Sequence, residues 1–370
     1  RICGICPVAY QMSSCHALEK ALGIDVTPDI RTLRRLLYCG EWIESHTLHM
    51  HLLHAPDFLG YESGISMAAD HKPLVERGLR LKKIGNQLLE IMGGRAIHPI
   101  NVTVGGFYRA PRKRELQGLL PELEWGLQAA QETLQQVAHF DFPDFDVDYQ
   151  FVSLKDDDQY PMNHGRVVSS SGLDIPVDQY PHHFQERHLP HSTALHSVML
   201  PEEIHYLVGP LARINNCFDQ LGPTAKRAAE EAGVEWPLKN NFMSIVARAI
   251  EVVEAYDTAV NIVKAYQAEP VPSRVAFQPR AGAGSHATEA PRGLLYHHYR
   301  LGDDGRVAEA TIVPPTSQNQ GQIEEDLRQF VPQIASLDDQ TATRKCEHMI
   351  RNYDPCISCA THFLQLTLER

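Results

Sequence analysis

Two cysteine pairs, one at each end of the chain, constrain its fold more than any other feature. Cys3 and Cys6 open the sequence, and Cys356 and Cys359 lie close to its end. Each pair has the Cys-x-x-Cys spacing with which two thiolates hold one metal site. Because nearly the whole chain separates the pairs, both ends must fold inward if the four thiolates form one site. Structural zinc sites take their ligands from short stretches, so this separation predicts a centre that performs chemistry.

The composition is that of an ordinary soluble globular protein. The 370 residues are 43% hydrophobic and 22% charged, and the formal net charge of -12 argues against a nucleic-acid-binding surface. No run of about 18 apolar residues predicts a membrane span, and no signal peptide is visible in this sequence. The chain opens directly on a ligand motif without a Met, so we expect that an N-terminal portion precedes it. The isolated cysteines are predicted to be small buried hydrophobes: Cys15, Cys39, Cys217 and Cys346.

Long helical patterns dominate the remainder of the chain. Apolar residues at helical spacing predict long helices over residues 32–54, 72–92, 112–140 and 241–266, and shorter ones over 202–216, 224–232 and 322–330. Strand-like pieces lie at residues 166–170 and 271–277. Stretches rich in Pro and Gly predict loops over residues 94–106, 142–161, 174–190 and 278–293. We therefore expect one mainly α domain over residues 1–370, a bundle of long helices around a buried metal site, with a small irregular α/β part at about 142–190.

The two cysteine motifs are richer than metal binding alone requires. The first reads Arg-x-Cys-Gly-x-Cys from Arg1, and the second reads Asp-Pro-Cys-x-x-Cys-x-x-His from Asp354 to His362. Together they closely resemble the large subunit of nickel–iron hydrogenases. The resemblance continues in the same order between them, in Arg-Ala-Ile-His-Pro at 95–99, Val-Gly-Pro-Leu-Ala-Arg at 208–213, Glu-Ala-Pro-Arg-Gly at 289–293 and Pro-Thr-Ser-Gln-Asn at 315–319. The match spans the chain, and it implies the fold of that family.

The resemblance implies a metal centre and its ligands. Cys3 and Cys356 would bind nickel terminally, and Cys6 and Cys359 would bridge nickel and iron. The iron would carry carbon monoxide and cyanide. His362 would bind a magnesium ion. Thiolates are soft ligands that suit such metals.

The resemblance also implies a catalytic surround for dihydrogen. Arg292 would hold its guanidinium over the open coordination site, next to Asp57 and Asp354, whose carboxylates would lock it by charge-assisted hydrogen bonds. Cys356 would take the proton when dihydrogen is split heterolytically. The pocket for the diatomic ligands would be lined by Pro291, Pro314, Pro315 and Thr316.

Simpler interpretations stand beside these. Two Cys-x-x-Cys pairs taken alone favour structural zinc, and an Arg with two Asp is more often a structural ion pair. Four histidines on one predicted helix, at mixed spacings, are predicted to serve packing or hydrogen bonding: His46, His49, His51 and His54. His297 and His298 are expected to support the site rather than ligate a metal.

Three features depart from the family pattern. Tyr10 stands where the family has a His four residues after the second cysteine. The family's proton-relay Glu and an upstream magnesium ligand would lie before Arg1. Eight residues follow His362, where family members are often cleaved during maturation.

The expected reaction is the reversible conversion of dihydrogen to two protons and two electrons. No cluster motif in this chain could carry the electrons away, so we expect an iron–sulfur small subunit as partner. The style of the first motif resembles the cytoplasmic branch of the family, in which a flavin-containing diaphorase-type subunit passes electrons to NAD or NADP. The alternatives are a non-catalytic structural or quinone-site subunit of a respiratory complex with the same fold, and a structural zinc protein.

Overall fold

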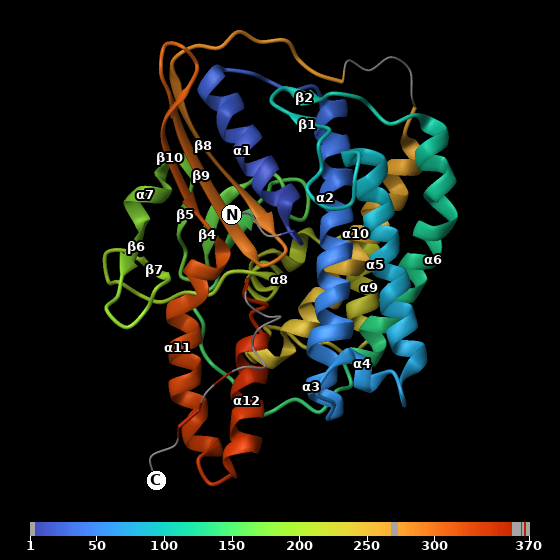
Figure 1. The fold of residues 1–370 in the computed structure, drawn as a ribbon, viewed down its shortest axis with the longest axis vertical. Coiled ribbons are helices and arrows are strands. Elements are labelled where there is room, and N and C mark those ends of the chain that lie inside the picture. The colour runs from blue at the N-terminus through green and yellow to red at the C-terminus, as the bar shows by residue number, and fades with distance from the viewer. Residues whose placement is uncertain (1–3, 268–272, 357–363, 365, 368–370) are drawn as a thin grey trace.

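The computed structural model describes residues 4–267, 273–356, 364 and 366–367. Helices dominate it and the sheets are small (Figure 1). The longer helices are α1 (Pro7–Leu22), α2 (Pro28–Leu48), α5 (Lys72–Gly93), α6 (Lys113–Val137), α10 (Ser244–Ala265), α11 (Pro315–Ile334) and α12 (Asp339–Arg351). None of the helices in these ranges combines the length and apolar character that crossing a lipid bilayer requires.

Short helical pieces link the longer ones. They are the π-helix η1 (His49–His54), α3 (Ala55–Leu59), α4 (Gly64–Met67), α7 (Tyr180–His183), α8 (Pro210–Cys217), α9 (Pro223–Glu231) and the 3₁₀ turns η2 (Val177–Gln179), η3 (Phe218–Gln220) and η4 (Asn241–Met243). The helix predicted over residues 202–216 begins only at Pro210. The reason is local, because Gly209 has φ 119°, which helical backbone cannot adopt, and Pro210 then starts the helix.

The helices α2, α5, α6 and α10 pack side by side as a bundle (Figure 1). α10 packs against both α2 and α6, and its Val246, Ile250 and Val253 are fully buried. Burial of each such side chain contributes about 1.5–3 kcal/mol. Gly85 lets α5 approach α2, since a Cβ there would lie 2.8 Å from the backbone nitrogen of Glu44. The four long helices predicted from periodicity are thus present, although π-helix η1 ends the first of them, predicted over 32–54, and α6 continues through Pro121.

A three-stranded antiparallel sheet lies against α1, in the order β10 (Val307–Val313), β9 (Gly293–Leu301), β8 (Gly282–Ala290). The prediction of a loop over residues 278–293 is therefore wrong for β8. The glycines that suggested a loop serve close packing instead. A Cβ at Gly284 would lie 2.2 Å from the carbonyl oxygen of Ala17, and one at Gly282 would lie 2.0 Å from that of Ala21. Only glycine lets this strand lie directly on α1.

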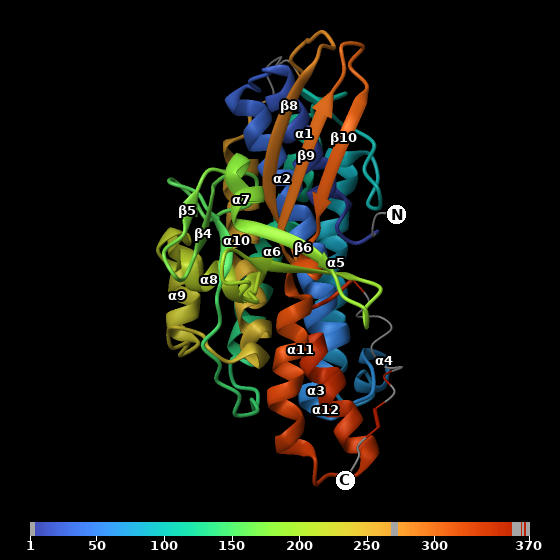
Figure 2. The same cartoon turned by 90° about the vertical axis from the view of Figure 1, so that its left-hand side faces the viewer.

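The remaining strands are short and antiparallel. They form the sheets β3 (Val152–Lys155), β4 (Arg166–Ser169), β5 (Asp174–Ile175); β6 (Phe184–His188), β7 (Leu195–Met199); and β1 (Val102–Thr103), β2 (Gly106–Phe107). Figure 2 shows β4 to β7 beside the bundle together with α8 and α9. β4 confirms the strand predicted at 166–170. The strand predicted at 271–277 is wrong over residues 273–277, where Arg274 makes an isolated bridge to Gly106.

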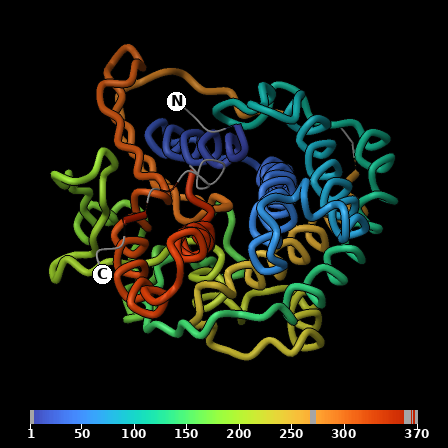
Figure 3. The backbone as a smooth tube through the Cα atoms, turned by 60° about the horizontal axis from the view of Figure 1, so that its bottom comes forward, coloured from blue at the N-terminus to red at the C-terminus, as the bar shows by residue number. Residues whose placement is uncertain are grey.

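Strands β3, β4 and β6 share a core with the β8–β9 hairpin, in which Val152, Val167 and Phe184 pack with Leu294 and Tyr296. In Figure 3, α1 lies beside the β8–β10 sheet, and Figure 1 shows α11 and α12 below that sheet. The β8–β9 hairpin therefore lies against the first helix and extends toward the last two helices. Its turn is placed where elements from both ends of the chain can meet.

Candidate metal centre

The first cysteine motif leads directly into α1. Cys6 is the N-cap residue and Pro7 occupies the first helical turn, where its missing N–H costs nothing. The buried carboxylate of Glu41, on α2, accepts hydrogen bonds from the backbone N–H groups of Val8 at 2.5 Å and Ala9 at 3.0 Å. A carboxylate at a helix N-terminus is favoured by the helix dipole. Cys6, only 3% exposed, is thereby fixed to the bundle.

Arg292 occupies a two-residue hairpin turn. Ala290 pairs with Gly293, which leaves Pro291 and Arg292 as the turn residues. Arg213 holds the turn in place, because it donates hydrogen bonds to the carbonyl oxygens of Ala290 at 2.9 Å and Pro291 at 3.1 Å. The arrangement also needs glycine at position 293, which has φ 133° and where a Cβ would meet a methyl carbon of Val208 at 2.6 Å. The turn is rigidly placed.

The guanidinium of Arg292 joins the two ends of the chain. Its Nε donates to the carbonyl oxygen of Asp354 at 2.5 Å, and one terminal nitrogen lies 3.2 Å from Asp354 Oδ1. The other terminal nitrogen lies 3.6 Å from Cys6 Sγ. Arg292 is 4% exposed and Asp354 1% exposed, so these contacts are shielded from water. The first cysteine motif and the residues just before the second therefore meet at one buried cation.

The second motif follows α12 through a tight bend. Asp354 has φ 47°, an uncommon value for a residue with a side chain, and both its backbone oxygen and its carboxylate face Arg292. Beyond it, the hydroxyl of Thr316 lies 3.3 Å from Cys356 Sγ and accepts from the Cys356 backbone N–H at 3.3 Å. Thr316 sits at the start of α11, just after Pro314 and Pro315. Three predicted site residues, Cys6, Arg292 and Asp354, thus meet, and Cys356, two residues after Asp354, contacts Thr316.

For Asp57, which was predicted to lie next to Arg292, the structure shows an ion pair with Arg351. The Asp57 carboxylate accepts two hydrogen bonds from Arg351, at 2.6 and 3.0 Å. Asp57 lies on α3, opposite the end of α12, so the nearest guanidinium is the one three residues before Asp354. Asp57 therefore supports the bend that carries Asp354 and Cys356.

The π-helix η1 supports the same bend. His49 Nε2 lies 2.9 Å from the carbonyl oxygen of Arg351, and His54 Nε2 lies 2.9 Å from the side-chain oxygen of Asn352. His51 bonds the carbonyl of Thr47, and His46 contacts Glu251 at 3.0 Å. The prediction that these four histidines serve hydrogen bonding and packing is confirmed. Burial lowers the pKa of each, so all four are neutral near pH 7.

A fully buried ionic network lies behind the hairpin turn. Arg213 binds Glu251 at 2.7 Å and Glu289 at 2.9 Å, and its guanidinium stacks over the Trp42 ring. Burial raises the pKa of Glu289 to about 7, which the Arg213 charge only partly offsets. Burial also opposes ionisation of Glu251, but the charge and hydrogen bonds of Arg213 outweigh it and hold the pKa of Glu251 at about 2. One carboxylate of the pair therefore titrates near neutral pH.

A second buried arginine faces the bend without a carboxylate. Arg248 donates to the hydroxyl of Ser244 at 2.9 Å and to the carbonyl of Asn352 at 3.0 Å. Within the described ranges it forms no ion pair, and burial lowers its pKa to about 10. The charges of Asp354 and Glu251 offset part of this effect, but a buried cation without an ion-pair partner is costly. This corner of the molecule is electrostatically suited to an anionic group.

Three of the predicted metal ligands, Cys3, Cys359 and His362, lie outside the described residues. The ring of Tyr10 packs edge-on against His297, whose Nδ1 lies 2.9 Å from the Tyr299 hydroxyl. The isolated cysteines Cys15, Cys39, Cys217 and Cys346 are all buried and free, as predicted.

Sequence reasoning missed several supporting residues. Arg213 and Glu289 lie inside two of the stretches singled out in the sequence, and Arg351 lies three residues before Asp354, but their roles depend on partners far along the chain. No sequence pattern pointed to Glu41, since nothing in the neighbouring sequence distinguishes it from an exposed Glu on a helix.

Comparisons with known proteins agree on one family. The model of the nickel-dependent hydrogenase family matches residues 1–77 and 202–362. Sulfhydrogenase 1 subunit alpha of Pyrococcus furiosus is 32% identical over 99% of this chain and 86% of its own length. NAD-reducing hydrogenase HoxS subunit beta of Cupriavidus necator is 28% identical over 98% of this chain and 83% of its own length. A crystal structure of an NAD+-reducing [NiFe]-hydrogenase in the H2-reduced state has the same fold, with a TM-score of 0.87, 24% identity, and coverage of 97% of this chain and 86% of that one.

Proposed function

Since this chain belongs to the nickel-dependent hydrogenase family, as a large, catalytic subunit, we propose that its four terminal cysteines hold a nickel–iron centre for the reversible heterolytic cleavage of dihydrogen. The ligands would be Cys3, Cys6, Cys356 and Cys359, with carbon monoxide and cyanide on the iron. His362 would hold a magnesium ion near the C-terminus. The observation that carries the proposal is the meeting of Cys6 and Asp354 at the buried guanidinium of Arg292.

The residues around this point fit an anionic thiolate–metal group. Cys6 Sγ is buried next to a guanidinium, which stabilises negative charge on the sulfur. Arg248 adds a second buried cation at the same bend. Thiolates are the ligands that soft metals prefer. When bound, a nickel–iron centre supplies the redox chemistry that polarises and splits dihydrogen.

The protein's own side chains would position and deprotonate the substrate. Arg292 would present its guanidinium to the reacting molecule, and Asp354 would keep it from rotating away. Cys356 would hold the released proton on Sγ, with Thr316 donating a hydrogen bond to that sulfur. Pro291, Pro314 and Pro315 would exclude water where the diatomic ligands lie. Asp57 would act indirectly, through Arg351.

We also propose the route of the electrons. An iron–sulfur small subunit would take them from this chain, and a flavin-containing diaphorase-type subunit would pass them to NAD or NADP in the cytoplasm. The names of the relatives support more than one acceptor, since one is a sulfhydrogenase and another is NAD-reducing. The fold likeness to an NAD+-reducing enzyme supports the NAD(P) branch. We further propose that residues 1–370 form a single domain, with an irregular α/β insertion at about 142–190.

The experiment is metal analysis and infrared spectroscopy on the matured complex purified with its partner chains. We expect stoichiometric nickel, and infrared bands of metal-bound carbon monoxide and cyanide. Exchange of Cys6 or Cys356 for Ser should abolish both signals. A correctly folded, matured complex without nickel would refute the proposed function. Dihydrogen-dependent reduction of NAD, NADP and sulfur, compared in one assay series, then decides the acceptor.

A further inference from the structure

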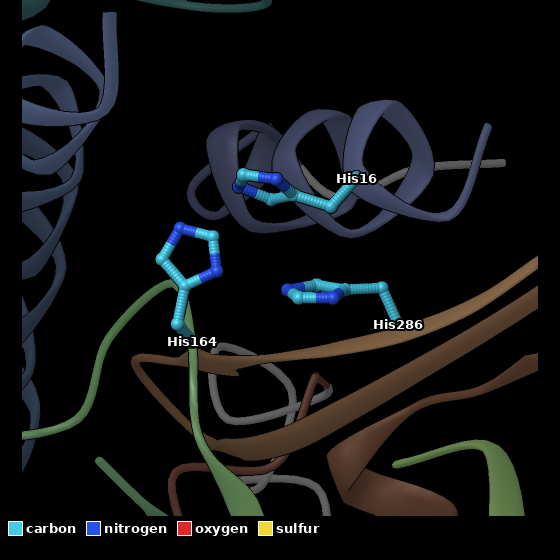
Figure 4. A group of neighbouring side chains, drawn as sticks. All are labelled: His16, His164 and His286. Carbon is cyan, nitrogen blue, oxygen red and sulfur yellow. The ribbon is translucent and has the colours of Figure 1, made fainter. Parts of the chain in front are cut away.

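Three histidines from distant parts of the chain converge away from the cysteine motifs. His16 lies on α1, His164 precedes β4, and His286 lies on β8 (Figure 4). Each offers a ring nitrogen, and these nitrogens all lie within 4.8 Å of one another. The ring centroids are 4.6 to 5.4 Å apart. We propose that His16, His164 and His286 form a binding site for a divalent transition metal ion, specifically Zn²⁺, in addition to the nickel–iron centre.

The close packing of β8 on α1 places two of the three rings together. The glycine at position 284 brings β8 onto the helix surface at Ala17, so the neighbouring His16 and His286 side chains meet across the contact. The segment before β4 closes the third side with His164. His16 is ten residues beyond Cys6 on the same helix, which is about 15 Å along its axis. The site is therefore distinct from the candidate metal centre.

The hydrogen bonds leave lone pairs available for a metal. His286 Nε2 lies 2.7 Å from the carbonyl oxygen of Asn163, so this nitrogen carries the ring proton and the other carries the lone pair. His16 Nδ1 lies between Glu19 Oε2, at 3.5 Å, and a guanidinium nitrogen of Arg34, at 3.4 Å; with its ring proton directed at the carboxylate, Nε2 keeps the lone pair. Carbonyl and carboxylate partners of this kind orient metal-ligating histidines. The remaining nitrogens, His16 Nε2 and His286 Nδ1, are buried and have no hydrogen-bond partner.

These unpartnered atoms are what a metal ion would satisfy. His16 and His286 are only 5% and 4% exposed. Leaving a buried polar atom unsatisfied costs about 1–3 kcal/mol. Burial, reinforced at His16 and His286 by neighbouring histidines, lowers the pKa of all three rings, that of His164 to about 4. All three are therefore neutral near pH 7, which is the state that ligates metals.

Charge and access also suit a metal ion. Arg34, the nearest cation, is paired with Glu19 at 2.6 Å, so its charge is largely offset. His164 is half-buried and lines an open cavity of about 640 Å³, together with Arg31, Arg35, Asp156, Asp158 and Glu254, which gives an ion an entry path from solvent. Three imidazoles without a thiolate suit zinc, with a fourth position left for water. The ion would cross-link α1, β8 and the segment before β4.

The test measures zinc in the purified complex. Wild type, His164→Asn and a control, His182→Asn on an exposed side chain of α7, are incubated with Zn²⁺ and dialysed, and their metals are counted by mass spectrometry. We expect one zinc per chain in the wild type and the control, and its loss in His164→Asn, with nickel and iron unchanged in all three. The zinc X-ray absorption spectrum should show imidazole nitrogens at about 2.0–2.1 Å. Added Zn²⁺ should raise the unfolding temperature of the wild type and leave that of His164→Asn unmoved.

Two results would overturn the assignment. The first is wild-type protein that retains no zinc after dialysis. The second is equal zinc in the wild type and His164→Asn, which would place the ion elsewhere. Because His164 is half-buried, its exchange for Asn leaves the core unchanged, and the unaltered nickel content verifies that the variant is folded.

Discussion

Exchange of Arg292 for Lys separates the charge of this residue from its geometry. The guanidinium makes three directed contacts, to the Asp354 carbonyl oxygen, to the Asp354 carboxylate and to Cys6 Sγ. A lysine ammonium keeps the positive charge, but it has one nitrogen on a flexible stem and cannot reach all three acceptors in this planar arrangement. The variant should therefore keep the electrostatic balance of the site and lose its precise orientation.

The size of the effect follows from the number of lost contacts. Hydrogen bonds to charged groups contribute about 1.5–3 kcal/mol each. Removing one preoriented donor from a water-excluded catalytic site typically lowers turnover by about 10²–10³-fold. Arg292→Lys retains at best the contact with Asp354, so we expect dihydrogen oxidation to slow by about 10²-fold. Nickel and iron contents should remain at wild-type levels, because Arg292 is not a metal ligand.

The assay is dihydrogen-dependent dye reduction by the matured complex, normalised to nickel. Arg300→Lys is the matched control, since Arg300 lies on the same hairpin but is exposed and pairs with Glu309. It should behave as wild type. A loss smaller than about threefold in Arg292→Lys at full nickel occupancy, which is less than 1 kcal/mol, would refute the assigned role.

Three further predictions follow from the surroundings of the site. Arg351→Met removes the guanidinium from the Asp57 carboxylate and should lower the free energy of unfolding by about 3 kcal/mol, as measured by urea denaturation; an unchanged midpoint would mean the pair is not structural. Glu289 has its pKa raised by burial from 4.5 to about 7, so the native state binds more protons than the unfolded chain in that window, and stability should fall as pH rises through it, by about 3 kcal/mol. Glu289→Gln should abolish this fall, and equal slopes for both proteins in urea titrations between about pH 5 and 8 would contradict the assignment. Thr316→Val removes the hydroxyl next to Cys356 Sγ and should slow turnover about fivefold, or about 1 kcal/mol, at unchanged nickel; wild-type turnover would show that the hydroxyl does not act on this sulfur.

The sequence predicted those parts of the fold that depend on local periodicity. α5, α6 and α10 follow from apolar residues at helical spacing, because each helix buries a continuous stripe. β8 was mistaken for a loop because the glycines at 282 and 284 are read locally as turn formers. Their actual role, close packing on α1, depends on a helix some 260 residues earlier, which no local pattern reveals.

In the candidate site, too, features set by the local sequence could be predicted and those set by distant partners could not. The cysteine motifs, Arg292 and Asp354 could be predicted as site residues because they lie in short, specific segments. The ion pair of Asp57 with Arg351 could not, since charge patterns do not say which buried arginine a carboxylate meets. The histidine cluster was equally invisible, because its members lie in three segments with no common spacing.

The distribution of buried charge explains why this corner needs an anionic group. Arg248, Arg292 and Arg351 all contact or belong to the segment 351–354, and in the described part of the chain Asp354 pairs with Arg292 and Asp57 with Arg351. Two unit charges 4 Å apart interact by about 4 kcal/mol at the effective dielectric constant of a partly shielded site. Among the described residues Arg248 has no carboxylate at ion-pair distance, although the charges of Asp354 and Glu251 raise its pKa, and the sulfur of Cys6 contacts the neighbouring Arg292. These arginines also contact the bend that leads to Cys356, so the assembly of the candidate site and its charge balance depend on the same residues.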